Sequence, residues 1–182
     1  ETYFKKQIFV EEDWNGGIYA TPTIMGSKSG NNIVLTWATL KYYGFKGYQE
    51  RANKILNTTQ IIVERLKQLR DIYILGNPQV NVIGINSKNL NIYQINQEMI
   101  NRGWNLNELQ LPESIHLCVT LNHCNDKIID KFVEDLTESI NETKANNLQG
   151  EECASVYGST QKIPDRRLIK HIAKHYIKLL SN

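Results

Sequence analysis

The chain has 182 residues, the length of one ordinary domain with a buried core. Hydrophobic residues make up 41%, charged residues 22%, and the net charge is +2, which excludes a disordered chain and disfavours nucleic acid as a partner. No apolar stretch approaches the roughly 20 residues that span a bilayer, and three cysteines without a CxxC pair fit a reducing compartment.

The first half of the chain predicts a loop followed by helices. Residues 1–13 mix aromatic and charged residues without a clear period, and residues 14–32 have the glycines and hydroxyls of a loop. Apolar residues then recur at three- and four-residue steps over 33–43 and 48–69. We therefore expect two helices, separated by the glycine-bounded segment 44–47.

The second half alternates short apolar runs with amphipathic ones. The predicted strands are 72–75, 80–85, 104–110 and 114–121. The predicted helices are 90–102, 127–143 and 167–180. This order indicates an α/β (α+β) fold with a short, mostly antiparallel sheet and helices on one face.

Several histidines and cysteines raise the possibility of a metal site. Four of them are close in sequence: His116, Cys118, His123 and Cys124. His116 and Cys118 share one face of an extended strand, but no second ligand pair follows at the spacing of a zinc site. His171 and His175 are one helical turn apart and have no third ligand nearby. We therefore predict core, strand-end and surface positions, and no metal.

The N-terminal loop ends in candidate anion-binding residues. Ser27, Lys28 and Ser29 stand just before the helix that begins near Asn32. A helix N-terminus with hydroxyls and a cation binds anions. Alternatively, Ser29 or Asn31 caps the helix, and the residue types alone favour the cap. The chain has no GxSxG, HExxH or GxxxxGK[ST] motif.

Two tyrosines lie in glycine-containing loops, Tyr19 in the N-terminal loop and Tyr157 in residues 154–160. Either hydroxyl could face a ligand, because neither tyrosine belongs to an apolar stripe. The alternative is a ring in the core with only its hydroxyl in water. Spacing alone leaves both interpretations open.

Five stretches, in this order, resemble the sphingosine-1-phosphate lyase family: "DWNGGIYATPTIMGSKSG", "WATLKYYGFKGYQE", "GNPQVNVIGINS", "RGWNLNELQLPESIHLCVTL" and "ASVYGSTQ". The resemblance covers nearly the whole chain. It implies a pyridoxal-phosphate enzyme of the aspartate-aminotransferase type (fold type I), related to the group II decarboxylases. The implied reaction is the retro-aldol cleavage of a phosphorylated sphingoid base to phosphoethanolamine and a fatty aldehyde.

The resemblance also implies how the chain is organised. Residues 1–32 would be the end of the large cofactor domain with an active-site loop, 33–70 connecting helices, and 71–182 the C-terminal small domain. The family's cofactor lysine normally stands in a His-Lys pair ahead of a "YFVDTDW"-like segment, whereas "QIFVEEDW" here has no His before it. We therefore expect the C-terminal portion of such an enzyme, which alone binds no cofactor and is inactive without the N-terminal remainder.

The family's active site lies at the interface of a homodimer, which implies roles for several residues. Those implied at the cofactor phosphate of the neighbouring chain are Gly26, Ser27, Ser29 and Gly30. Those implied around the substrate are Tyr19, Thr21, Thr23 and Lys28. Tyr157 matches a family tyrosine implied in proton transfer or phosphate binding. Relatives usually read Gly-Ser-Arg-Pro-Gly over 26–30, and Lys28 keeps the charge of that arginine without its planar fork.

Two other functions remain possible. One is a related pyridoxal-phosphate-dependent amino-acid decarboxylase, against which the GGIYATPT and VYG loops argue. The other is a dimerisation module without catalysis. The Asn-, Ile- and Lys-rich residue usage is compatible with a cytosolic enzyme, and we expect a cytoplasmic, soluble segment, although eukaryotic relatives are anchored at the endoplasmic reticulum through a region outside this chain.

Overall fold

A computed structural model describes the chain over residues 2–22, 26–149 and 163–180. It contains two compact units, the first formed by Glu1–Ala52 with Ile163–Asn182 and the second by Asn53–Lys162. The longest helix, α2 (Gly30–Leu66), begins in the first unit and ends in the second.

The first unit has a small hairpin with a helix against it. Its elements are α1 (Thr2–Gln7), β1 (Phe9–Glu11), β2 (Tyr19–Thr21) and α6 (Arg166–Leu180). The strands pair antiparallel with Val10 opposite Ala20, and Ile177 of α6 packs with Ile8 and Val10. The predicted last helix is confirmed, but the segments expected to lack regular structure contain α1 and both strands.

Ion pairs fix α6 to the end of β1. Lys170 Nζ lies 2.9 Å from Glu12 Oε2, Arg166 Nε lies 3.3 Å from Asp13 Oδ1, and the Arg166 guanidinium also donates to the Glu12 carbonyl. Burial raises the pKa of the Glu12 carboxyl, but its hydrogen bonds and the positive charges of Lys170 and Arg166 together outweigh burial, so that the net pKa is lowered. Glu12 is therefore a buried carboxylate that is stabilised by its partners.

A glycine interrupts α2 where the sequence predicts a break. Gly44 has φ 56°, a left-handed conformation that costs glycine little. The break at Gly44 is confirmed, whereas Gly47 lies inside the helix. The residues of α2 that are buried all follow this break: Thr58, Thr59, Ile62, Val63 and Leu66.

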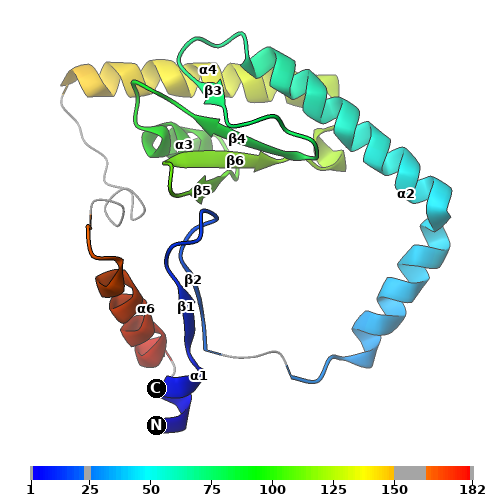
Figure 1. Cartoon of the computed structure of the whole chain (residues 1–182). Helices are drawn as coiled ribbons and strands as arrows, with labels where there is room; N and C mark the ends of the chain where they lie inside the picture. The colour runs from blue at the N-terminus through cyan, green and yellow to red at the C-terminus, as the bar shows by residue number, and fades with distance from the viewer. Residues whose placement is uncertain (1, 23–25, 150–162, 181–182) are drawn as a thin grey trace. The chain divides into compact units, whose positions relative to one another are not determined.

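The second unit is built on a four-stranded antiparallel sheet in the order β3-β4-β6-β5 (Figure 1). Its strands are β3 (Tyr73–Ile74), β4 (Val82–Asn86), β5 (Asn107–Leu109) and β6 (Ser114–Cys118). The predicted antiparallel sheet is thus confirmed. The strand predicted to reach Leu121 ends earlier, because a 3₁₀ turn, η1 (Leu121–His123), follows Thr120.

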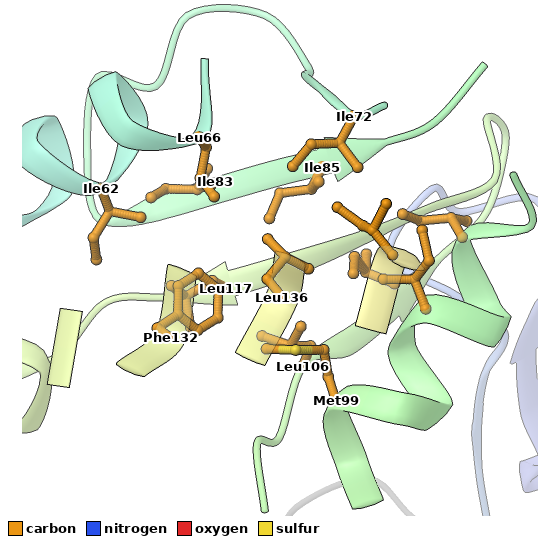
Figure 2. Packing of buried hydrophobic residues seen from close by; sticks show 14 of the residues in the cluster. Ile62, Leu66, Ile72, Ile83, Ile85, Met99, Leu106, Leu117, Phe132 and Leu136 are labelled. Atoms are coloured by element: carbon orange, nitrogen blue, oxygen red, sulfur yellow. The ribbon is translucent and has the colours of Figure 1, made fainter. Parts of the chain in front are cut away.

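Helices α3 (Ile92–Asn101) and α4 (Asp126–Gln149) cover one face of this sheet together with the end of α2. Figure 2 shows Ile83 and Ile85 of β4 pointing toward Phe132 and Leu136 of α4. The alternate residue Val82 and its cross-strand partner Cys118 are exposed. The expected arrangement, with helices on one face, is therefore confirmed.

Candidate active site

The residues that the family resemblance assigns to the cofactor phosphate occupy one short segment. Gly26, Ser27, Lys28 and Ser29 lead directly into Gly30, the first residue of α2, and all five are exposed. A Cβ added at Gly26 or Gly30 would meet no atom of the described residues within 4 Å. The backbone here is open to a ligand from outside its own core.

Ser29 caps α2. Its Oγ accepts a hydrogen bond from the Asn31 N–H at 3.3 Å, and its carbonyl accepts one from the Asn32 N–H at 3.1 Å. The Ser29 hydroxyl therefore satisfies one of the free donors of the first helical turn. Ser27 and Lys28 form no hydrogen bond or ion pair with any residue that the structure describes.

This segment opens into a cavity of about 730 Å³ along the first turns of α2. Its lining residues are Ser27, Lys28, Ser29, Asn32, Ile33, Thr36, Trp37 and Leu40. The polar end carries two hydroxyls and a cation at a helix N-terminus, where the helix dipole favours negative charge. Ile33, Trp37 and Leu40 recur at helical spacing and form an apolar wall.

The apolar wall is exposed and was not assigned to the site from the sequence. Ile33, Trp37 and Leu40 are 55% to 62% exposed, although their spacing is that of a helix face turned to a core. One sequence signal could have identified them: between Gly30 and Phe45 the helix has a single charged residue, Lys41. An uncharged helix start after a glycine-rich loop is unusual for a surface that faces only water.

The structure describes only some of the residues that the family resemblance places around the substrate. Tyr19 lies on β2, half-exposed, with its ring centroid 6.2 Å from that of Phe9. Thr21 ends the same strand and is half-buried. Thr23 and Tyr157 lie outside the described residues. Within the described part of the chain, no hydrogen bond, ion pair or ring contact joins Tyr19 to the segment 26–30, so their meeting in one site stays a prediction.

The histidines and cysteines considered for zinc have separate surroundings. On β6, His116 Nε2 lies 3.4 Å from Asn107 Nδ2, and burial lowers the pKa of the imidazole. Cys118, on the same face, accepts from the Asn81 amide at 3.4 Å. His123 accepts from the Thr120 N–H at 2.9 Å and so caps η1. Within residues 2–22, 26–149 and 163–180, no three potential ligands gather at one place.

Curated sequences similar to this chain carry one recurrent name. Sphingosine-1-phosphate lyase 1 of Rattus norvegicus is 37% identical over 181 residues, which cover 99% of this chain and 32% of the rat protein. The probable sphingosine-1-phosphate lyase of Legionella pneumophila is 36% identical and covers 96% of this chain and 31% of its own length. The chain thus spans about a third of the relatives it matches. No family model matches it.

Solved structures agree with this likeness. The sphingosine-1-phosphate lyase of Burkholderia pseudomallei superposes with a TM-score of 0.62 and 32% identity, over 82% of this chain and 34% of that one. Glutamate decarboxylase of Lactobacillus brevis superposes with a TM-score of 0.55 at 18% identity, over 76% of this chain and 34% of that one, a likeness of fold alone.

Proposed function

Because this chain is homologous over nearly its whole length to sphingosine-1-phosphate lyases, we propose that it is the C-terminal portion of such a lyase. The likeness over 99% of the chain is the observation that carries this proposal. The substrate is a phosphorylated sphingoid base. The bond between its amine-bearing and hydroxyl-bearing carbons breaks, the hydroxyl carbon becomes a fatty aldehyde, and the other carbon takes a proton to give phosphoethanolamine.

The segment 26–30 has the donor set that a phosphate group requires. The Ser27 hydroxyl, the Lys28 ammonium and the N-terminal turn of α2 are exposed at one place, and the flanking glycines leave room for close approach. We assign Gly26, Ser27, Ser29 and Gly30 to the phosphate of pyridoxal phosphate and Lys28 to that of the substrate. When bound, the cofactor supplies the electron sink for the carbon–carbon cleavage.

The remaining roles follow from the family likeness. Tyr19, Thr21 and Thr23 line the substrate side of the site, and Tyr157 holds or moves a proton at the reacting carbon or binds the substrate phosphate. In the same proposal, residues 1–32 form the end of the large domain and residues 71–182 form the small domain. Residues 33–70 form the helices that connect the two domains.

The active site also needs protein outside this chain. We propose a homodimer with the site at the subunit interface, a cofactor lysine in the N-terminal remainder, and a cytoplasmic location for this segment. The exposed, nearly uncharged apolar wall of α2 supports a protein cover, because charged residues are depleted at the cores of protein interfaces. Among the described residues, no helix is long and apolar enough to cross a membrane.

A product assay on the full-length polypeptide tests the proposal. Incubation with sphingosine 1-phosphate and pyridoxal phosphate should release fatty aldehyde and phosphoethanolamine in equal amounts. Ser27→Ala should weaken cofactor binding, whereas Thr39→Ala, an exposed hydroxyl of α2 bonded to the Leu35 carbonyl, should not. Release of carbon dioxide from an amino acid, with no aldehyde formed, would indicate the related amino-acid decarboxylase. A folded dimer that neither binds pyridoxal phosphate nor forms product would indicate a dimerisation module.

A further inference from the structure

Helix α6 exposes an apolar stripe beside the face that packs on the hairpin. Its inner residues Ala173 and Ile177 contact the cluster formed by Ile8 and Val10. The stripe consists of Leu168, Ile172, Tyr176 and Leu179, which are 50% to 62% exposed. Their spacing of four, four and three residues places them along one line of the helix. The described residues of the first unit therefore leave part of the apolar arc of α6 exposed.

The polar face of α6 is entirely basic. Between Arg166 and Leu180 the sequence RRLIKHIAKHYIKLL contains no acidic residue. On this face Arg166 forms an ion pair with Asp13, Arg167 with Asp165, and Lys170 with Glu12. Four further basic residues line a hollow of about 290 Å³ beside Ile8: His171, Lys174, His175 and Lys178.

The composition of α6 distinguishes its stripe from that of α2. The apolar wall of α2 (Ile33, Trp37 and Leu40) lies in a segment with Lys41 as its single charge, which suits burial against protein. Lysine is depleted at protein interfaces, whereas a helix with apolar residues on one face and lysines on the other is typical of those that lie in the plane of a membrane surface. Charge complementarity therefore favours an anionic lipid surface as the occupant of the α6 stripe.

We propose that α6 docks this protein on an anionic phospholipid surface. The stripe Leu168, Ile172, Tyr176 and Leu179 enters the headgroup–acyl boundary, and Lys174 and Lys178 meet the lipid phosphates. Long lysine side chains reach outward from an apolar face in this way. The helix, about 22 Å long, lies along the surface and does not span it. This inference does not depend on the proposed lyase activity.

Vesicle co-sedimentation of the full-length polypeptide tests the proposal. Vesicles of phosphatidylcholine mixed with phosphatidylserine should bind the protein, and phosphatidylcholine alone should bind it far less. Each cation lost should weaken binding about fivefold, so Lys174→Glu/Lys178→Glu should weaken it by at least tenfold. Ile172→Asn should lower binding as well. Lys54→Glu, the same charge change on an exposed part of α2, should leave binding unchanged.

Three results would overturn the proposal. The first is no binding to anionic vesicles, and the second is equal losses in Lys54→Glu and Lys174→Glu/Lys178→Glu. The third is a change of oligomeric size in Ile172→Asn without loss of vesicle binding, which would show that protein covers the stripe.

Two controls accompany these measurements. Circular dichroism shows whether each variant is folded, and Lys174→Gln/Lys178→Gln is the milder variant to use if Lys174→Glu/Lys178→Glu misfolds. Cleavage of a short-chain, water-soluble substrate should be unchanged, so that failure of docking and failure of the lyase proposal remain distinguishable.

Discussion

The indole N–H of Trp104 donates to Oδ2 of Asp135 over 2.6 Å, which joins the segment after α3 to the middle of α4. Lys131 Nζ lies 2.7 Å from the same oxygen, and the Trp104 ring meets Phe132 edge-on with ring centroids 5.0 Å apart. Asp135 is buried, so its charge depends on these two donors. One side chain, Trp104, thus contributes both packing and a polar contact.

Replacing Trp104 with Phe should destabilise the second unit by about 1.5–3 kcal/mol, because a hydrogen bond to a buried carboxylate is lost. Tyr73→Phe is the control, since it removes a hydroxyl from a partly exposed ring on β3. Urea unfolding monitored by circular dichroism measures both variants. Equal stability of Trp104→Phe and the parent would mean that water replaces the indole at Asp135.

The same contact predicts a dependence of stability on pH. Burial raises the pKa of Asp135, but the hydrogen bonds from Lys131 and Trp104 and the positive charges of Lys131 and Arg102 together outweigh burial, so that the net pKa is lowered in the folded protein. A carboxyl with a lowered folded pKa stabilises the fold above its unfolded pKa, roughly pH 4, and loses that contribution as pH falls through the folded pKa.

Asp135→Asn should therefore flatten the fall in stability below about pH 4. Unfolding curves collected at several acidic pH values measure this slope. Asp130→Asn is the matched control: Asp130 lies on the same helix, is exposed and pairs with Arg65 at the surface, where ion pairs contribute little. An identical acid dependence for Asp135→Asn and the parent would contradict the prediction.

The second unit could be predicted from its sequence because its helices and strands are determined by local patterns. Ile83, Ile85, Ile115 and Leu117 alternate with more exposed residues, and Ile129, Phe132 and Leu136 follow helical spacing. In the first unit helix α6 was predicted from its amphipathic spacing, but the strands were not, because β1 and β2 are only three residues each and lack such a pattern. In the candidate site Ser27–Ser29 were predicted, but Trp37 has a core-like spacing and its exposure is decided by tertiary structure.

Phe132 should be the costliest single truncation in the core of the second unit. It is almost fully buried and contacts Trp104, so Phe132→Ala should cost about 3–5 kcal/mol through lost burial and a cavity. Leu121→Ala, at a partly exposed position of η1, should cost far less. Thermal unfolding of the two variants gives the comparison. Similar losses would show that neighbouring side chains close around the missing ring.

Lys28 provides a test of phosphate recognition at the candidate site. It is exposed at the cavity and forms no ion pair with a described residue. In the full-length enzyme, Lys28→Gln should raise KM for the phosphorylated substrate by about tenfold, the cost of one charge-assisted hydrogen bond. Lys28→Arg should keep or lower KM, because a guanidinium binds phosphate bidentately. Unchanged KM in Lys28→Gln would remove Lys28 from the site.

Ser29 caps α2 and, in our proposal, also contacts the cofactor phosphate, and one pair of substitutions can separate the two roles. Its hydroxyl caps α2, so Ser29→Ala should destabilise the first helical turn by about 1 kcal/mol, whereas Ser29→Asp should restore the cap. A carboxylate beside a bound phosphate is repelled, so Ser29→Asp should nevertheless weaken pyridoxal phosphate binding at least tenfold in the full-length enzyme. Cofactor titration and thermal unfolding report the two effects independently. If Ser29→Asp binds the cofactor like the parent, Ser29 serves the helix alone, and the phosphate contact rests on Ser27 and the flanking glycines.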